Sequence, residues 1–179
     1  TFWLIILILF QTALTETVST KQIRIVSTAN VHGETDPCGW KKKPLGGLAR
    51  KATIIDNLRS EGFDVLILDA GNLLFKKETL GPGTPTETAK MTAEIIISAF
   101  NDIGCHAFSP GSKDFAAGLD FLMTQHNNAN FPYVSCNIAN KTNKLLFKSA
   151  DDSIFTDKFL PLNSGEIFIL ISADLSCIL

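Results

Sequence analysis

The sequence predicts an α/β domain built on a mainly parallel sheet with flanking helices. Between residues 21 and 138, short runs of β-branched residues alternate with longer amphipathic stretches, which is the pattern of βαβ units. One run, DVLILD at 64–69, is apolar on both faces, as a central parallel strand should be. A chain of 179 residues, 45% hydrophobic and 19% charged, can bury one sizeable core. We therefore expect one domain or a truncated piece of a larger one.

The first βαβ unit is predicted between residues 22 and 69. Its first strand spans 22–27 and its second strand is the run at 64–69. A helix at 45–60 joins them, because four apolar residues fall on one helical face: Leu48, Ala52, Ile55 and Leu58. Gly62 is expected to end this helix.

The next units extend the sheet. A helix is predicted at 86–102, with Thr86 as its N-cap and Gly104 after its end. Three of its residues are expected to face inward: Ile95, Ile96 and Ala99. The other predicted elements are a strand at 106–109, a helix at 115–126 and a strand at 132–136. Later segments at 144–148, 154–160 and 166–172 are expected as strands of a meander or of a second sheet.

The N-terminal segment reads as an export signal. An uninterrupted apolar run at 2–10 precedes a polar, small-residue stretch at 11–20; the run has the length of a signal-peptide core and is too short to span a bilayer. We expect residues 1–20 to be a signal peptide or an N-terminal anchor, and 21–179 to be the domain, incomplete at its C-terminus. A periplasmic or extracellular location follows, with membrane anchoring through residues 2–14 as an alternative.

The charge of the chain limits its partners. The formal net charge of −2 gives no general attraction to a nucleic acid polymer or to an anionic membrane, so a ligand must be recognised by a local site. In open parallel sheets ligands sit at the carboxyl ends of the strands. The loops that leave those ends begin at Asn30, Ala70, Pro110 and Asn137.

Five motifs together resemble a known family. They are TANVHG at 28–33, GGLARKATIIDNLR at 46–59, LDAGNLLF at 68–75, SPGSKDFAAG at 109–118 and FPYVSCNIAN at 131–140. Over residues 23–139 their order and spacing resemble the calcineurin-like metallophosphoesterases, in particular the 5'-nucleotidase branch. The resemblance implies the metallophosphoesterase sandwich as the fold. It also implies two divalent metal ions, held by loops that read Asp-x-His, Gly-Asp and Gly-Asn-His-Asp/Glu, which polarise a phosphate ester and generate a hydroxide nucleophile.

The chain departs from these motifs at the metal ligands. His32 is kept, but Asn30 stands where the first Asp would be and Asn72 where the bridging Asp would be. Ser112 replaces the Asn of the third motif and Lys113 replaces its His. Two dications about 4 Å apart repel by roughly 16 kcal/mol at an effective dielectric of about 20, and anionic ligands must offset this. With two carboxylates lost and an ammonium added, we expect no di-metal centre.

Three interpretations of the pocket stay open. In the first, the site is inactive and the asparagine side chains only form hydrogen bonds with the loop backbone. In the second, the pocket is rebuilt to hold a phosphate- or nucleotide-type anion without metal. In the third, His32, Asn30 and Asn72 weakly hold a single Zn, Mn or Fe ion. No other cofactor is expected. The candidate ligand-binding residues are Asn30, His32, Asn72, Ser112, Lys113 and Asn137.

The predicted function follows from this pocket. We expect an exported domain of the 5'-nucleotidase type whose degenerate site binds phosphate or nucleotides, or performs thiol redox chemistry, rather than hydrolysing esters efficiently. One alternative is a working metal-dependent phosphoesterase with a reduced ligand set. Lys113 and Asp114 are the candidate catalytic residues. The other alternative is a non-catalytic accessory domain attached to a larger envelope protein.

The cysteines suggest a further use of the same sheet edge. There are four, with no CxxC pair: Cys38, Cys105, Cys136 and Cys177. Cys38 and Cys136 are expected to be neighbours, as a disulfide, as a ligand set with His32, or as redox thiols. The loop around Trp40 resembles an exported subgroup in which a thiol or selenol occupies that position, so codon 40 is either a misread selenocysteine codon or an ordinary tryptophan.

Overall fold

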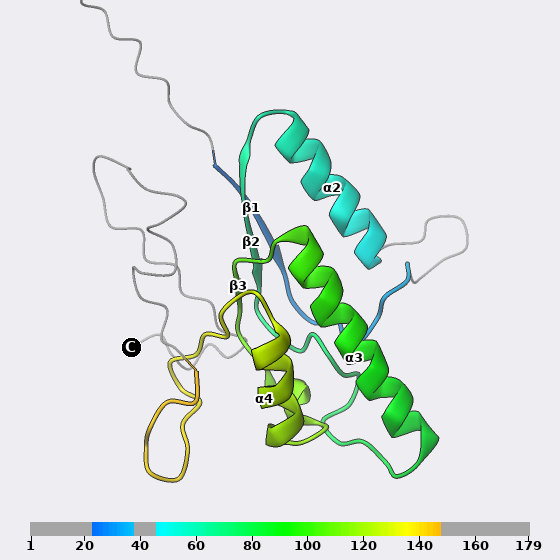
Figure 1. Ribbon diagram of the computed structural model, residues 1–179, viewed down its shortest axis with the longest axis vertical. Helices are drawn as coiled ribbons and strands as arrows, with labels where there is room; N and C mark the ends of the chain where they lie inside the picture. The colour runs from blue at the N-terminus through cyan, green and yellow to red at the C-terminus, as the bar shows by residue number, and fades with distance from the viewer. Residues whose placement is uncertain (1–22, 38–45, 148–179) are drawn as a thin grey trace, which may run out of the picture.

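A three-stranded parallel sheet forms the centre of the molecule. The computed structural model describes residues 23–37 and 46–147 (Figure 1). The strands, in sheet order, are β1 (Ile23–Thr28), β2 (Asp64–Asp69) and β3 (Ala107–Phe108). The prediction of a mainly parallel sheet with flanking helices is therefore confirmed.

The central strand, β2, pairs along its whole length with β1. The register runs from Ile23 opposite Asp64 to Thr28 opposite Asp69. The pairing with β3 is short and joins Leu68 to Ala107. This register brings the carboxyl ends of β1 and β2 level with each other, so the loops that follow them start side by side.

Four helical segments of the described residues accompany the sheet. They are α2 (Leu48–Ser60), α3 (Thr84–Ile103), the 3₁₀ turn η2 (Ser112–Phe115) and α4 (Leu119–Asn128). In Figure 1, α2 and α3 lie along the same side of the strands, and they contact each other. Within the described ranges, no helix combines the length and the hydropathy needed to cross a membrane.

The core divides along β2, because successive side chains of a strand point to opposite faces. Val65 and Ile67 are buried in the large cluster that includes Phe100 of α3. Leu66 and Leu68 are buried in a smaller cluster on the other face. The whole strand is thus enclosed, as the apolar run at 64–69 predicts.

The predicted inward face of α2 is confirmed at three of its four positions. Ile55 is fully buried and Leu48 and Leu58 pack against the same cluster. The described part of the helix begins at Leu48 after Gly47, and residue 45, where the start was predicted, lies outside the described residues.

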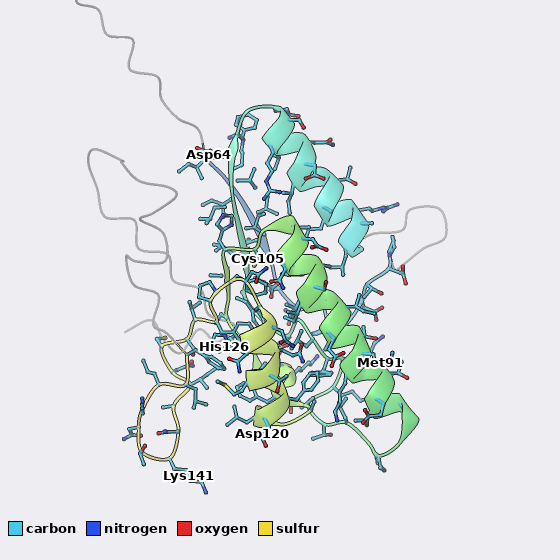
Figure 2. All side chains as sticks on the ribbon, viewed as in Figure 1. Asp64, Met91, Cys105, Asp120, His126 and Lys141 are labelled. Atoms are coloured by element: carbon cyan, nitrogen blue, oxygen red, sulfur yellow. The ribbon has the colours of Figure 1, made fainter. Side chains whose placement is uncertain are left out.

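Two details predicted for α3 are wrong. Thr86 is not the N-cap: Gly83 is, and the helix begins earlier because Pro85 fits its first turn. Ile95 does not face inward, since it is 58% exposed, whereas Ile96 is fully buried. The side chain of Met91, one helical turn before Ile95, also lies on the outer side of α3 (Figure 2).

The predictions after β3 are only partly right. Gly118, with a φ of 90°, separates η2 from α4, so the single helix predicted at 115–126 is instead a turn followed by a shorter helix. The strand predicted at 132–136 is reduced to one parallel bridge between Phe108 and Tyr133, and the one at 144–148 to an antiparallel bridge at Leu145. The segments predicted at 1–20, 154–160 and 166–172 lie outside the described residues.

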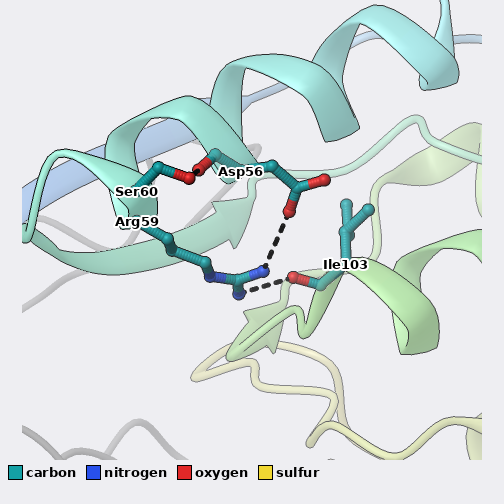
Figure 3. Close-up of polar contacts among 4 residues, drawn as sticks. All are labelled: Asp56, Arg59, Ser60 and Ile103. Carbon is teal, nitrogen blue, oxygen red and sulfur yellow. Dashed lines mark hydrogen bonds and ion pairs between the residues drawn. The ribbon is translucent and has the colours of Figure 1, made fainter.

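A polar contact fixes α2 to the end of α3 (Figure 3). Arg59 Nη2 donates to the backbone carbonyl of Ile103 at 2.8 Å, and Arg59 Nη1 lies 3.8 Å from Asp56 Oδ1. The last carbonyls of a helix have no partner within the helix, so a guanidinium there supplies one. Gly104, in the left-handed conformation, ends the helix and leaves space for this side chain, because an added Cβ would lie 3.1 Å from Arg59 Nη2.

Candidate functional site

The backbone pairing of β1 and β2 continues beyond the strands into their loops. The Ala70 N–H donates to the Thr28 carbonyl, the Asn30 N–H to the Gly71 carbonyl and the His32 N–H to the Asn72 carbonyl, each at 2.8 Å. Two loops far apart in sequence are therefore held together, and Asn30 is placed beside Asn72.

Three non-glycine residues of these loops adopt the left-handed backbone conformation. Asn30, His32 and Asn72 have φ values of 56°, 58° and 53°. Asn and His are among the non-glycine residues that occupy this region most often, but the conformation still carries strain that the surrounding structure must hold. The strain is concentrated in the residues predicted from the sequence as ligands.

The two asparagines bind each other rather than leaving their oxygens free. Asn72 Nδ2 donates to Asn30 Oδ1 at 2.9 Å, and the backbone N–H of Lys113 donates to Asn72 Oδ1 at 3.1 Å. Gly111 lies against this amide so closely that an added Cβ would come within 2.5 Å of Asn72 Oδ1. The amide of Asn72 thus links all three loops.

Lys113 reaches back over this network to the histidine. Its Nζ lies 3.0 Å from His32 Nε2. A charged ammonium only donates, so the imidazole accepts at Nε2 and is the neutral, Nδ1-protonated form. Partial burial, then the charges of Lys113 and Lys76, lower the pKa of His32 below its usual value, which favours this neutral form.

Asp114 holds the backbone of the site through hydrogen bonds. It is fully buried, and its carboxylate accepts the backbone N–H groups of Gly111, Asn72 and Leu74, each at 2.8 Å. Burial raises its pKa although these N–H donors act to lower it. This placement gives Asp114 a positioning role, because its oxygens hold the loop that presents Asn72.

Two predicted ligand-binding residues contact other groups. The exposed Ser112 hydroxyl lies 3.3 Å from Glu78 Oε1, and Asn137 Oδ1 accepts a hydrogen bond from Ser135 Oγ at 2.9 Å. Neither side chain has a contact with His32 within the described part of the chain. Asn137 lies four residues beyond the bridge at Tyr133 and remains outside the network.

Of the two cysteines predicted to be neighbours, Cys38 and Cys136, the structure describes only Cys136. Cys136 is exposed and disulfide-bonded, and the other half of that disulfide lies outside the described residues, as Cys38 and Trp40 do. Cys105 is a free, buried thiol near the start of β3 (Figure 2). Burial raises the pKa of Cys105 to about 12, so it is an unreactive thiol.

A second polar cluster was not foreseen from the sequence. Lys51 Nζ donates to Thr28 Oγ1 at 2.9 Å, and Thr28 Oγ1 donates to the fully buried Asp69 at 2.5 Å. Burial raises the pKa of Asp69 to about 6 and lowers the pKa of Lys51. The available signals were a carboxylate that ends an otherwise apolar strand and a lysine at a position of α2 close to its apolar face.

Two cavities open on either side of His32. One, of about 340 Å³, lies between the loop after β2 and the start of α3 and is lined in part by Leu74 and Lys76. The other, of about 430 Å³, lies between the loop after β1 and the start of α2 and is lined in part by Leu48 and Lys51. Both volumes are in the range of small-molecule sites.

The described residues around His32 do not fit a metal centre. In the described residues, no three His, Cys, Asp or Glu side chains come together as a metal site. The Asn30 and Asn72 oxygens already accept hydrogen bonds, and the Lys113 ammonium points at the imidazole nitrogen that would bind a cation. An ammonium at that place repels a metal ion, and neutral amides cannot offset the charge of two.

Solved structures define the class of fold. No family model matches the chain. A calcineurin-like phosphoesterase from Bacillus subtilis, YfkN, is similar over 69% of this chain and 39% of its own, with 26% identity and a TM-score of 0.54. The fold is that of the calcineurin-like phosphoesterases, which confirms the expectation drawn from the motifs.

Sequence relatives define the branch. A 5'-nucleotidase of Vibrio parahaemolyticus is 33% identical over 136 residues, which is 73% of this chain and 22% of the relative. A 2',3'-cyclic-nucleotide 2'-phosphodiesterase/3'-nucleotidase of Yersinia enterocolitica is 30% identical over 143 residues, or 76% of this chain and 22% of the relative. The matches thus span about a fifth of these relatives. The chain is a distant homologue of them and belongs to the nucleotidase branch of the metallophosphoesterase superfamily.

Proposed function

We propose that this domain binds a phosphate group, free or on a small molecule such as a nucleotide, through Lys113 and without metal ions. The observation that carries the proposal is the 3.0 Å contact between Lys113 Nζ and His32 Nε2. It places a fixed positive charge at the carboxyl edge of the sheet, where such folds bind ligands. An ammonium has three N–H donors, and only one has a partner among the described residues.

The surroundings of His32 suit a phosphorylated organic ligand. The 340 Å³ cavity has apolar walls that include Leu74 and Phe75. Lys76 and Lys77 also line it, and both are exposed. Lys76 is paired with Glu34 at 2.5 Å, which leaves Lys77 as the second positive charge near an anion. An apolar wall with a few charges is the usual make-up of a small-molecule site.

Efficient ester hydrolysis does not fit this arrangement. Hydrolysis by metal ions needs a bound water whose pKa is lowered by the cations, and the described residues provide no ligand set to hold them. Lys113 is an acid and a donor, so it stabilises a bound phosphate without supplying a nucleophile. We therefore propose binding as the role of the pocket, and export to an oxidising compartment as its setting.

The alternative function is a metal-dependent phosphoesterase with a reduced ligand set, and the names of the relatives favour it. The Vibrio relative is a 5'-nucleotidase, but this chain spans 22% of it. The proposal and this alternative make opposite predictions about chelators, because a chelator removes metal ions and leaves the Lys113 ammonium in place.

Calorimetry separates the two functions. The full chain is titrated with inorganic phosphate and with adenosine monophosphate in the presence of EDTA. We expect binding that survives EDTA and weakens at least about tenfold in Lys113→Ala, since a charge-assisted hydrogen bond contributes about 1.5–3 kcal/mol. The matched control is Lys144→Ala, an exposed lysine outside the site, which should bind as wild type does.

One outcome overturns the proposal in favour of the alternative. If EDTA abolishes binding, and manganese restores turnover of a phosphate ester that disappears in His32→Ala, the domain is a metal-dependent hydrolase. If no phosphate compound binds with or without metal, the pocket is inactive and the domain is left with an accessory role.

The disulfide of Cys136 supports a second candidate role in thiol chemistry. Cys136 is exposed, and exposed disulfides are the ones most often reduced in function. Equilibration of the folded chain with defined ratios of reduced and oxidised glutathione tests this role. Reversible reduction within the physiological range of potentials supports it, and resistance to reduction contradicts it.

A further inference from the structure

The 430 Å³ cavity has a composition unlike that of the proposed phosphate site. Its walls include Val31, Leu48 and the ring of Phe100, so most of its surface is apolar. Glu34 and Lys76 line both cavities and pair with each other, whereas Asp36 lines only this one of the two, and its carboxylate disfavours an anionic ligand. The cavity therefore suits a small, uncharged and mainly apolar molecule.

Two lysines line this cavity: Lys76 is paired with Glu34, whereas Lys51 lies against Thr28 and Phe100. Lys51 comes from the second turn of α2, and its Nζ lies 4.0 Å from the centre of the Phe100 ring. The ring face and the hydroxyl of Thr28 hold the side chain in place. Contact with the ring favours the ammonium, so the resting amine carries a proton that must leave before it can act as a nucleophile.

The structure supplies a path for that proton. Lys51 Nζ donates to Thr28 Oγ1 at 2.9 Å, and Thr28 Oγ1 donates to Asp69 Oδ2 at 2.5 Å. The same hydroxyl thus accepts from the amine and donates to the carboxylate. Burial raises the pKa of Asp69 to about 6 and lowers that of Lys51, and this convergence reduces the free-energy cost of moving the proton between them.

We propose that Lys51 is a carbonyl-reactive amine, and that the 430 Å³ cavity binds a small, mainly apolar aldehyde or ketone as a Schiff base on its Nζ, with Thr28 and Asp69 receiving the proton. This site is separate from Lys113 and does not rest on the proposed phosphate binding. A desolvated lysine in an apolar pocket is a recognised way to activate an amine for this chemistry.

The step balances without any further reagent. The ammonium of Lys51 passes one proton through Thr28 Oγ1 to Asp69, and the freed lone pair forms a bond to the carbonyl carbon. The π electron pair moves to the carbonyl oxygen, which takes the proton that the attacking nitrogen loses, and a carbinolamine forms. The carbinolamine oxygen then takes the proton held by Asp69 and leaves as water while the carbon–nitrogen double bond forms. The net reaction converts the Lys51 ammonium and one carbonyl compound into a protonated Schiff base and one water.

The test uses benzaldehyde with sodium cyanoborohydride at pH 7 on the full chain, which converts each imine to a stable benzyl-lysine. Peptide mapping by mass spectrometry gives the initial rate at each lysine in one sample. A lowered pKa leaves more of the Lys51 side chain as the free amine at pH 7, and the cavity holds the aldehyde beside it, so we expect Lys51 to react severalfold faster than the exposed Lys144. Lys51 reacting no faster than Lys144 would overturn the proposal.

Two further measurements keep the roles of the cavity and of the proton path distinguishable. Benzyl alcohol, which has the shape of the probe without the carbonyl, should slow labelling at Lys51 and leave Lys144 unchanged. Thr28→Val, which keeps the shape of the side chain and removes the hydroxyl, should slow labelling at Lys51 relative to wild type and leave Lys144 unchanged, with folding checked by circular dichroism. If Lys51 labelling is unchanged in Thr28→Val, the proton path through Thr28 is wrong. If benzyl alcohol does not slow labelling at Lys51, the cavity does not bind the aldehyde.

Discussion

At the scale of single residues, two fully buried carboxylates have different roles. Asp114 receives three backbone N–H groups and fixes a loop. Asp69 receives one backbone N–H, from Gly71 at 2.9 Å, and the hydroxyl of Thr28. With fewer donors to stabilise its charge, Asp69 should titrate in a range that a folding experiment can reach.

Asp69 should make the stability of the fold depend on pH. Its pKa is about 6 in the folded chain against 3.8 for the ordinary group, so the folded state binds the proton more tightly. Its stabilising contribution is complete below pH 3.8 and is lost as the pH rises through about 6. Asn at this position cannot ionise, so the free energy of unfolding of wild type should fall by roughly 2.4 kcal/mol relative to Asp69→Asn between pH 4 and pH 7.

Urea unfolding of both proteins at pH 4, 5.5 and 7 measures this difference. A gap between wild type and Asp69→Asn that stays constant over the range would mean that Asp69 does not titrate there.

At the scale of the helices and strands, Arg59 makes two interactions that should differ in their contribution to stability: a hydrogen bond between α2 and the end of α3, and an exposed ion pair within α2. Arg59→Ala removes the bond to the Ile103 carbonyl and should lower the free energy of unfolding by about 1 kcal/mol. Asp56→Ala removes only the ion-pair partner, which lies 3.8 Å away and is 73% exposed, so it should change the stability by less than about 0.5 kcal/mol. Urea unfolding measures both, and equal losses would show that the ion pair, rather than the bond to the helix end, stabilises this contact.

The elements also show where sequence reasoning succeeded. The strand at 64–69 and the apolar face of α2 were predicted, because burial on both faces and a 3.6-residue period leave direct marks in the sequence. The start of α3 was missed, because Pro85 permits a first turn before the threonine that looked like a cap. The break at Gly118 was missed because a glycine in an otherwise helical pattern does not reveal its φ.

At the scale of the whole molecule, parallel topology explains how much of the site could be predicted. Loops that leave adjacent parallel strands must start at one edge, so the meeting of Asn30 with Asn72 follows from strand order alone. The contact of Lys113 with His32 did not follow, since the torsions of a long lysine side chain leave no trace in the sequence. The relay from Lys51 to Asp69 depends on how α2 packs over β1 and β2, which a pattern of apolar residues does not specify.

The same topology predicts that the metal site can be rebuilt. The triple variant Asn30→Asp, Asn72→Asp, Lys113→His places two carboxylates and a second imidazole around His32 and removes the competing ammonium. We expect it to bind manganese at least about tenfold more tightly than wild type, because hard cations prefer anionic oxygen ligands. Calorimetry with manganese chloride, reversed by EDTA, measures the gain; equally tight binding by wild type would show that charge balance does not govern this pocket.

The contact of the Lys113 ammonium with His32 decides where the positive charge of the pocket comes from. A metal ion reaches an enzyme from solution, competes with other ions and is lost to scavengers, whereas a side-chain ammonium is made with the protein and cannot dissociate. A pocket charged in this way would still attract anions where trace metals are scarce, whereas a protein that depends on dissolved metal ions would lose its activity there.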